Sequence, residues 1–510
     1  MADSTPAPDA DTRAANPNAN RSTTPVSTTF RDYLSTQWAE RTETLPAPRE
    51  VAAFAAARRL RVSAMHPGER LIIPAGPARV RSNDTDYAYR AHSAFSHLTG
   101  WGADAVPDSV LVMEPSAEGH DATLYFRATA GRDSDEFYAN AAIGEFWLGP
   151  RPSLAHVAAD LALPTKDLGE LESVLESTGA TTRIVREADR DLTDQVDGRR
   201  LLDAELADDG LASSSDTDGL DTDGDALLLR DLSELRLVKD AWEIAQMRAA
   251  IAATQQGFDD VVADRPAIVA HPRGERLVEG TFNRRARAEG NQVGYDTIAA
   301  SGPHACILHW TRNDGPVIPG DLILLDAGIE LDSLYTADIT RTLPINGTFS
   351  AVQRQVYEAV REAADAALAI VRPGIRFREI HAEAMKVIAA KTAEWGFLPV
   401  TAQESLDPDA QYHRRYMVHG TSHHLGIDVH DCAQARRELY LEGILEAGMV
   451  FTIEPGLYFQ PDDLTVPEEY RGIGVRIEDN ILVTETRAEN LSIGIPRTAD
   501  DVEAWLRAGA

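Results

Sequence analysis

Leu322-Ile323-Leu324-Leu325-Asp326-Ala327-Gly328 is an apolar, strand-like run that carries an aspartate near its end. After a turn, the next such run contains Ala337-Asp338-Ile339-Thr340, with its aspartate twelve residues after the first. A β-hairpin formed by the two runs would bring Asp326 and Asp338 side by side. Two carboxylates at touching distance must share a proton or a metal ion. Taken alone, the pair could also be a capping aspartate and a turn aspartate.

Three later segments place a histidine and two glutamates in similar surroundings. They are His419-Gly420-Thr421-Ser422-His423, Thr452-Ile453-Glu454-Pro455-Gly456 and Val475-Arg476-Ile477-Glu478-Asp479. Charged side chains in apolar runs are costly to bury unless something compensates them. Carboxylate and imidazole ligands without a thiolate suit divalent ions such as Mn²⁺, Co²⁺ or Zn²⁺. The sequence therefore predicts a metal centre built from two aspartates, one histidine and two glutamates.

The histidine motif leaves the ligand open. His419 and His423 have the spacing of a zinc-binding helix, but that pattern needs a glutamate where Gly420 stands. Gly, Thr and Ser between the two histidines favour a loop that leads into a strand. His423 and His424 are adjacent, so only one of them can point inward along a strand.

The two glutamate segments predict different surroundings. Pro455-Gly456 signals a turn, which would leave the Glu454 carboxylate at the end of its strand. Arg476 and Glu478 are two residues apart and face the same side of a strand. We therefore expect Arg476 to orient a carboxylate ligand of the cluster, and a surface ion pair is the alternative.

In these segments the chain resembles the pita-bread metallopeptidases, and among them aminopeptidase P. The matching order Asp, Asp, His, Glu, Glu runs through residues 236–495. The resemblance selects His423, because the family pattern is His-Gly-x-Ser-His with its last histidine as the ligand. It also implies that Glu454 is a ligand and the general base. The implied metal ligands are Asp326, Asp338, His423, Glu454 and Glu478.

Three further histidines match family positions. The resemblance implies that His309 and His430 contact the substrate or stabilise the tetrahedral intermediate, and that His419 has a supporting role near the site. Without the resemblance, His309 and His430 would be read as half-buried histidines with ordinary hydrogen bonds. We expect His92 and His97 to be structural, because no carboxylate cluster accompanies them.

The implied activity is hydrolysis of the N-terminal Xaa-Pro bond in peptides that have proline second. The implied cofactor is a pair of divalent ions, Mn²⁺ first and Zn²⁺ or Co²⁺ as alternatives, which activate a water molecule. One alternative is a prolidase that cleaves only Xaa-Pro dipeptides. The other is a non-catalytic pita-bread protein that binds a partner.

The fold class is predicted as α+β, with two domains. Residues 30–203 alternate strands and helical runs, which indicates a smaller α/β domain. Within it, residues 89–101 resemble the N-terminal domain of aminopeptidase P, although alone they read as an amphipathic loop and strand. Residues 236–495 show helices and a mainly antiparallel sheet, and the resemblance implies a pita-bread catalytic domain.

Helix start signals support the second domain. Asp240 with Glu243, and Ser350 with Gln353, have the spacing of capping boxes. A further helix is predicted over residues 377–393. We expect a strand and then a turn at each of the carboxylate segments.

The remaining segments are predicted to lie outside the domains. Residues 1–29 are expected to be a disordered tail, residues 204–235 an acidic low-complexity linker, and residues 496–510 a C-terminal tail. The spacing Asp221-x-Asp223-x-Asp225 hints at a calcium loop, but a leucine occupies the place of its final glutamate.

Composition limits the compartment and the partners. The 510 residues carry a net charge of −32, which disfavours nucleic acid and anionic membranes. No apolar run reaches the roughly 18 residues of a membrane span, and the N-terminus lacks the apolar stretch of a secretory signal. With only two cysteines, a cytoplasmic location is the expectation. We also expect a homo-oligomer, a dimer or a tetramer.

Overall fold

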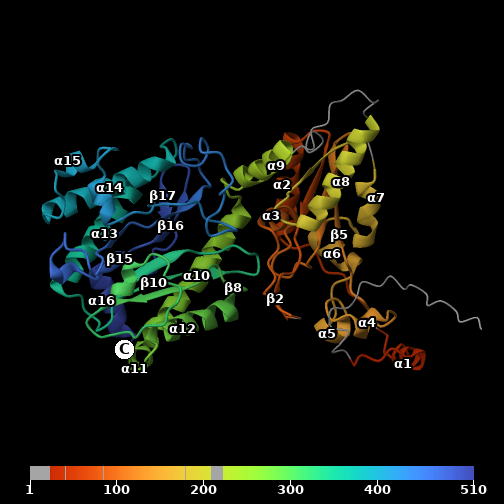
Figure 1. Ribbon diagram of the computed structural model, residues 1–510, viewed down its shortest axis with the longest axis horizontal. Coiled ribbons are helices and arrows are strands. Elements are labelled where there is room, and N and C mark those ends of the chain that lie inside the picture. The colour runs from red at the N-terminus through yellow and green to blue at the C-terminus, as the bar shows by residue number, and fades with distance from the viewer. Residues whose placement is uncertain (1–22, 41, 84, 178–179, 208–221, 510) are drawn as a thin grey trace, which may run out of the picture.

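The computed structural model of the chain describes residues 23–509 except 41, 84, 178–179 and 208–221. An N-terminal unit, residues 23–235, lies beside a C-terminal unit that begins at residue 236 (Figure 1). Most of the predicted disordered tail falls outside the described residues. Helix α1, Thr28–Leu34, begins at the end of that segment.

A five-stranded mixed sheet forms the centre of the N-terminal unit, in the order β6-β5-β4-β1-β7. Both of its faces are covered: Leu71 and Ile73 point into one core, whereas Ile72 points into another. Strands buried on both faces read as continuous apolar runs, as in the segments predicted here. The strands are β1 Glu69–Pro74, β4 Val110–Ser116, β5 Gly119–Phe126, β6 Thr165–Asp167 and β7 Thr181–Ile184, with a separate hairpin of β2 Val80–Ser82 and β3 Thr85–Asp86.

The segment 89–101 folds differently from its expectation as a loop and strand. It contains helix α3, Ser93–Thr99, in which every residue is buried. Gly100 ends the helix at φ 76°, a left-handed conformation that glycine adopts without strain. Burial of Phe95 and Leu98 in the core of the unit outweighs the weak helix propensity of the segment. The other helices here are α2 Val51–Met65, α4 Glu136–Ala139, α5 Glu145–Leu148, α6 Leu154–Leu161, α7 Leu171–Leu175 and α8 Arg190–Ala207.

The prediction of an acidic linker over residues 204–235 is wrong for the last part of this segment. Residues 208–221 lie outside the described residues, but Thr222–Leu235 is helix α9. Its Leu228, Leu232 and Leu235 recur on one face and are buried in the core of the N-terminal unit. Two of its acidic residues, Asp223 and Asp225, fall in the first turn, where the helix dipole favours them.

The calcium-loop alternative also fails at its one buried aspartate. Asp225 accepts hydrogen bonds from the Ile184 backbone N–H at 2.9 Å and from Arg200 at 2.7 and 2.8 Å. Arg186 adds a contact at 3.0 Å. These donors already neutralise the carboxylate, so it serves to pack α9 against β7.

Antiparallel strands make up the sheets of the C-terminal unit. Strand β10, Leu322–Ala327, lies between β9, Ile298–Ser301, and β12, Ile339–Pro344. Strand β13, Val450–Ile453, pairs with β16, Asp479–Val483. The remaining strands are β14 Gly456–Tyr458, β15 Gly474–Arg476, β17 Ala488–Asn490, β8 Gln292–Val293 and β11 Ile329–Glu330. The expected α+β class is confirmed.

Helices lie on the outside of these strands (Figure 1). Both predicted capping boxes form, Asp240 with Glu243 at the start of α10 and Ser350 with Gln353 at the start of α13. The helix predicted over residues 377–393 is α14, Phe377–Glu394. The others are α10 Ala241–Ala263, α11 Arg265–Ala270, α12 Gly274–Glu289, α13 Ala351–Ile370 and α15 Ala402–Ser405.

The predicted C-terminal tail, residues 496–510, also differs in the structure. Ala499–Ala508 forms helix α16, capped by the Thr498 side chain. Val502 and Leu506 are buried in the main core of the C-terminal unit. This amphipathic helix therefore belongs to the fold. In the part of the chain that the structure describes, no helix is long and apolar enough to cross a membrane.

Candidate metal centre

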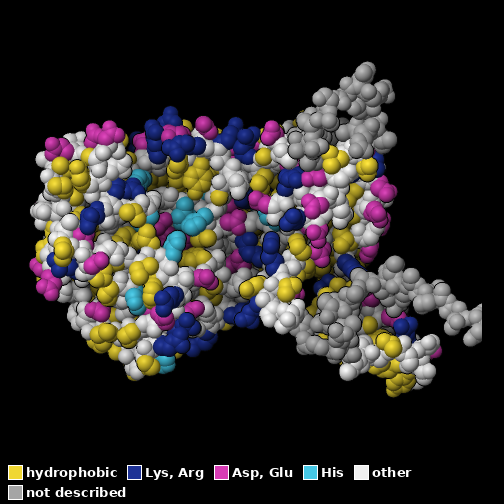
Figure 2. Space-filling model, viewed as in Figure 1, with side chains coloured by type: hydrophobic (Ala, Val, Ile, Leu, Met, Phe, Trp, Pro, Cys, Tyr) yellow, Lys and Arg dark blue, Asp and Glu magenta, His cyan; other side chains and the backbone are white. Residues whose placement is uncertain are grey.

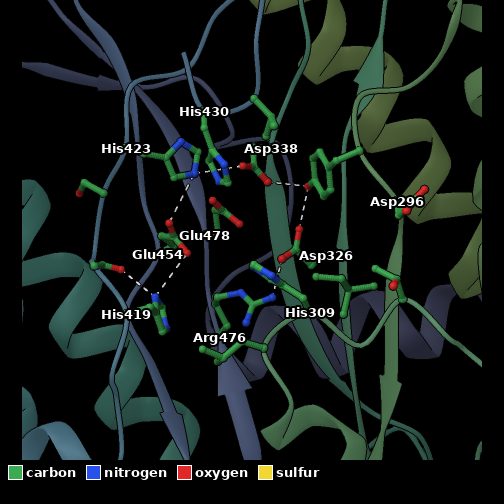
Figure 3. A pocket seen from close by; sticks show the side chains of 17 residues that line it. Asp296, His309, Asp326, Asp338, His419, His423, His430, Glu454, Arg476 and Glu478 are labelled. Atoms are coloured by element: carbon green, nitrogen blue, oxygen red, sulfur yellow. Dashed lines mark hydrogen bonds and ion pairs between the residues drawn. The ribbon is translucent and has the colours of Figure 1, made fainter. Parts of the chain in front are cut away.

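A cavity of about 440 Å³ opens in the C-terminal unit. Figure 2 shows histidine side chains gathered in a hollow on this face, and Figure 3 shows the side chains that line the cavity. Every residue that the sequence singled out for the site lines it. These residues are Asp326, Asp338, His423, Glu454, Glu478, Arg476, His309, His419 and His430.

The two aspartates are brought together by the pairing of β10 with β12. Asp326 lies opposite Thr340 in this register, and Asp338 directly precedes β12. A side chain at position 328 would overlap the Ala337 carbonyl oxygen, so Gly328 permits the close approach that places Asp338 here. The Asp-Ala-Gly motif therefore has a structural reason.

Tyr295 joins the two carboxylates, and no sequence motif singles it out. Its hydroxyl lies 2.7 Å from Asp326 Oδ1 and 2.5 Å from Asp338 Oδ1. One O–H can donate to only one of these oxygens at a time. Tyr295 lies just before β9, in a segment without apolar periodicity, so only its place in the fold identifies it.

Glu478 is 1% exposed and carries an unpaired oxygen. Thr340 Oγ1 donates to Glu478 Oε2 at 2.8 Å, but Glu478 Oε1 has no hydrogen-bond partner among the described residues. Asp338, His423 and Glu478 each offer a ligand atom, and these atoms lie within 4.8 Å of one another. A buried carboxylate oxygen without a donor, facing another carboxylate and an imidazole, fits a divalent cation.

His423 points into the carboxylate cluster. Its Nε2 lies 3.2 Å from Asp338 Oδ2 and 3.5 Å from Glu454 Oε1, while Nδ1 lies 3.2 Å from the His424 carbonyl oxygen. Burial lowers the pKa of His423, but these two carboxylates outweigh it and raise the pKa to about 9. In the metal-free protein, a proton on His423 Nε2 occupies the position at which a metal ion would bind.

Burial and the neighbouring carboxylates also raise the pKa values of the two glutamates. Burial raises the pKa of Glu454 to about 7, although His423 and Arg476 lower it. The pKa of Glu478 is raised well above its ordinary value by burial and then by the neighbouring Asp338. Without a metal ion, burial and mutual repulsion disfavour the simultaneous ionisation of all carboxylates in the cluster.

Arg476 is the cation within the protein that meets this cluster. Its guanidinium is 4% exposed and donates to Asp326 Oδ2, to Tyr458 Oη at 3.1 Å and to Thr340 Oγ1 at 3.1 Å. The alternative of a surface ion pair is therefore wrong. One side chain holds the Asp326 carboxylate in place, as expected, and also contacts Tyr458.

His419 lies behind Glu454. Its Nε2 is 2.8 Å from Tyr458 Oη, and its Nδ1 is 3.7 Å from Glu454 Oε2. Burial, and then the charge of Arg476, lowers the pKa of His419 to about 3, so the imidazole is neutral. The sequence left Tyr458 unassigned, whereas in the structure it links His419 with Arg476.

His309 and His430 are exposed side chains on loops at the cavity. The His430 ring is 4.4 Å from the His423 ring, at an angle of 88°. Burial, and then the neighbouring His423, lowers the pKa of His430. Both side chains can therefore reach a molecule bound over the carboxylate cluster.

A buried glutamate holds the loop that carries His309. Glu275 of α12 is fully buried, and its Oε1 accepts from the Ser301 N–H at 2.8 Å and lies 2.7 Å from His304 Nδ1. Its Oε2 accepts from Trp310 Nε1 at 3.0 Å and from the Gly315 N–H at 2.6 Å. All four partners belong to residues 301–315, which contain His309.

The remaining histidines that the sequence considered have packing roles. His424 is buried and stacks on Phe377, with ring centroids 4.6 Å apart. His92 accepts from the Ala94 N–H at the start of α3, and His97 lies 3.4 Å from Glu243. None of them lines the cavity described above.

Comparisons with known proteins cover both units. The pattern of metallopeptidase family M24 matches residues 245–485, and that of the aminopeptidase P N-terminal domain matches residues 54–185. Xaa-Pro aminopeptidase 2 of Streptomyces coelicolor is 50% identical over 475 residues, which is 93% of this chain and 95% of the relative. Xaa-Pro aminopeptidase of Escherichia coli is 32% identical over 89% of this chain and 97% of the relative.

Solved structures agree with these relatives. A variant of Escherichia coli aminopeptidase P in complex with substrate matches with a TM-score of 0.75 and 30% identity, over 91% of this chain and 99% of that one. The aminopeptidase PepP of Pseudomonas aeruginosa matches with a TM-score of 0.75 and 30% identity, over 90% of this chain and 98% of that one.

Proposed function

The chain belongs to metallopeptidase family M24 and is an Xaa-Pro aminopeptidase, and on this premise we propose that its cavity holds two divalent metal ions. The unpaired Oε1 of Glu478 carries the proposal, because the Glu478 carboxylate offers a ligand atom within 4.8 Å of those of His423 and Asp338 in a buried, carboxylate-rich site. Five such ligands exceed what one tetrahedral ion needs. The proposed ligands are Asp326, Asp338, His423, Glu454 and Glu478.

Manganese is the proposed ion. Four carboxylates and one imidazole, with no thiolate, form a donor set that suits Mn²⁺ and tolerates Zn²⁺ or Co²⁺. A zinc-substituted Escherichia coli aminopeptidase P, in complex with product, is among the similar structures. Activity after reconstitution of the metal-free enzyme with each ion separately would rank them.

Divalent ions bound here would supply Lewis acidity for the hydrolytic water and for the substrate carbonyl. The proposed base is Glu454, whose carboxylate lines the cavity and can accept a proton from the water and pass it on. Its proton goes to the prolyl nitrogen as the peptide bond breaks. The leaving prolyl nitrogen needs this proton, as the leaving nitrogen of any amide does.

His309 and His430 are proposed to donate hydrogen bonds to the oxyanion that develops on the carbonyl. Their exposed loops let them reach a peptide above the carboxylate cluster. His419 is proposed to steady Glu454 as a neutral partner, because it lies beside that carboxylate and bonds to Tyr458. Arg476 keeps Asp326 oriented through their ion pair.

Proline specificity is proposed to come from the apolar part of the cavity. Ile298, Leu308 and Val429 line it near the two exposed histidines and offer a surface for a five-membered ring. A prolidase also needs a group that captures the dipeptide carboxylate. In this chain, by contrast, the part of the peptide beyond proline is proposed to extend out of the cavity through its open side.

A comparison of peptide lengths tests this function. The Mn²⁺-loaded enzyme is expected to release the first residue from an Xaa-Pro-Yaa tripeptide and from a proline-second pentapeptide. It should cut the matching Xaa-Ala-Yaa peptide far more slowly. Rapid cleavage of an Xaa-Pro dipeptide with the pentapeptide left intact would instead support a prolidase.

The domain division and the cellular setting remain proposals. We propose an N-terminal domain that starts near residue 30 and a catalytic domain that starts at residue 236 and includes helix α16. Cys306 and Cys432 are both free and buried, which supports a reducing, cytoplasmic location. Exposed Phe146, Trp147 and Leu148 on α5 support a homo-oligomer, which light scattering of the purified protein would test.

A further inference from the structure

One side chain of the N-terminal unit reaches the loop that carries His430. Arg90 directly precedes the segment that forms α3, and its Nη2 donates to the Ile427 carbonyl oxygen at 2.6 Å and to Asp428 Oδ1 at 3.2 Å. The Ser93 hydroxyl, which also belongs to the N-terminal unit, donates to the same Asp428 oxygen. Residues 426–431 are called the His430 loop below.

The same guanidinium also binds the sheet of the C-terminal unit. Arg90 Nε donates to Glu330 Oε2 at 2.7 Å, and Glu330 is buried in β11, just beyond the strand that carries Asp326. Arg90 therefore fixes the distance between the His430 loop and the sheet. Charge-assisted hydrogen bonds of this kind are stronger than neutral ones.

The other end of the His430 loop is held separately. Asp431 is buried and binds Arg236 at 2.9 Å and Lys239 at 3.1 Å. Its backbone N–H donates to the His424 carbonyl oxygen at 2.9 Å. The N-terminal end is held by the Thr336 N–H, which donates to the Gly426 carbonyl oxygen at 3.1 Å, and Asp428 also lies 3.6 Å from Arg236. Arg90 adds the contacts from the N-terminal unit to Ile427 and Asp428.

We propose that Arg90 is a positioning residue for His430, and that the N-terminal unit in this way helps to build the active site. The proposal rests on the proposed function, in which His430 contacts the reacting carbonyl. The His430 side chain is exposed, whereas Gly426, Ile427 and Asp431 are buried, so contacts of these flanking residues set the position of His430. A displacement of about 1 Å at such a group can cost up to roughly a hundredfold in rate.

Substitution of Arg90 by methionine tests the proposal, because it removes the charge and keeps most of the length. In Arg90→Met we expect kcat to fall about tenfold, while KM stays within about twofold. Arg90→Lys should recover part of the rate, since the ammonium can still meet Asp428. Ser93→Ala removes one hydrogen bond and should lower kcat by a few fold, and it serves as the test if Arg90→Met does not fold.

Arg58 supplies the matched control. It also joins the two units, from α2 to Asp240 at 2.7 Å, and it is more deeply buried than Arg90. None of the hydrogen bonds and ion pairs that Arg58 forms with the described residues reaches the His430 loop. Arg58→Met should lower the Tm at least as much as Arg90→Met and leave kcat unchanged. An equal loss of kcat in both variants would overturn the proposal, because any weakened interface would then have the same effect.

A double-mutant cycle separates this proposal from the proposed function. If Arg90 acts through His430, adding Arg90→Met to His430→Ala should lower kcat by less than about twofold. A full tenfold loss in both backgrounds would overturn the positioning role and leave the role of His430 intact. An unchanged kcat in His430→Ala alone would instead contradict the proposed function of that histidine.

Discussion

The five proposed metal ligands, called the acidic floor below, and the two exposed histidines His309 and His430 are positioned in different ways. Asp326, Asp338 and Glu478 lie in or beside paired strands of one unit, and each is less than a tenth exposed. His309 and His430 are exposed side chains on loops, and Glu275 and Arg90, which are far from these loops in sequence, contact them. The comparison indicates that sheet pairing fixes the carboxylates, whereas distant side chains fix the histidines.

This difference sets the size of the expected effects. A substitution in the floor removes a proposed metal ligand and with it the reaction. A substitution in a loop, or in the residue that holds the loop, weakens one contact to the substrate. The predictions below therefore run from the floor to the loops and then to the stability of the floor itself.

The largest effect is expected from loss of a ligand. Asp338→Ala and His423→Ala should each reduce activity to less than about a tenth of the wild type, with the metal content reduced in parallel. Circular dichroism should show that the fold is retained, because the core is built by other residues. Normal activity in either variant would remove that residue from the proposed ligands.

The next largest effect is expected from the loss of one of the two exposed histidines. His430→Ala should lower kcat by about 10²–10³-fold, the usual loss when one oxyanion donor is removed. The metal content should stay at the wild-type level, which distinguishes this variant from those in the floor. A variant that loses metal as well would place His430 with the ligands and weaken the comparison.

A smaller effect is expected from the residue that holds the other loop. In Glu275→Gln, an amide N–H₂ group would face the N–H donors of Trp310 or Gly315, so the loop around His309 should shift. We expect kcat to fall about tenfold with little change in KM. Glu289→Gln, at the exposed end of the same helix, is the control and should behave as the wild type. Equal rates for the two variants would show that His309 does not depend on this carboxylate.

The smallest effect concerns the stability of the metal-free floor. Glu454 and His423 have pKa values near 7 and 9, above their ordinary values of 4.5 and 6.5. Between about pH 6.5 and pH 9, these two groups therefore hold more protons in the folded chain than in the unfolded chain. Stability must then fall as pH rises through this window.

Thermal unfolding across that window measures the effect. The Tm of the metal-free protein should drop as pH rises, whereas a metal-loaded sample should lose less, because ligands bind metal in their deprotonated forms. A variant that carries both Glu454→Gln and His423→Gln should show a flatter profile. A Tm of the metal-free wild type that rises with pH would contradict the electrostatic account of the floor.

The sequence predicted the floor better than the groups around it. Asp326 and Asp338 could be paired because apolar runs and a turn signal a hairpin, and Arg476 could be placed because residues two apart share one face of a strand. Tyr295 was missed, since nothing in its local segment sets it apart from other half-buried tyrosines. Its contact to both aspartates exists only after β9 packs beside β10.

The same reasoning accounts for the helices that were not expected. The acidic composition around α9 obscured the helical spacing of the leucines that are buried on one of its faces. Helix α16 follows an irregular loop, so its start was not predicted. Arg90 could not be assigned for a similar reason, because its partner loop lies in the other unit, far along the chain. Local pattern predicts local structure, and contacts between distant segments need the folded chain.

Metal stoichiometry tests the central claim most directly. Metal-free protein would be loaded with excess Mn²⁺, freed of unbound ion by gel filtration and measured by elemental analysis. The five proposed ligands predict about two manganese ions per chain in the wild type and a clear loss in Asp338→Ala. One ion or fewer per chain in fully active wild-type enzyme would contradict the dinuclear site on which this account depends.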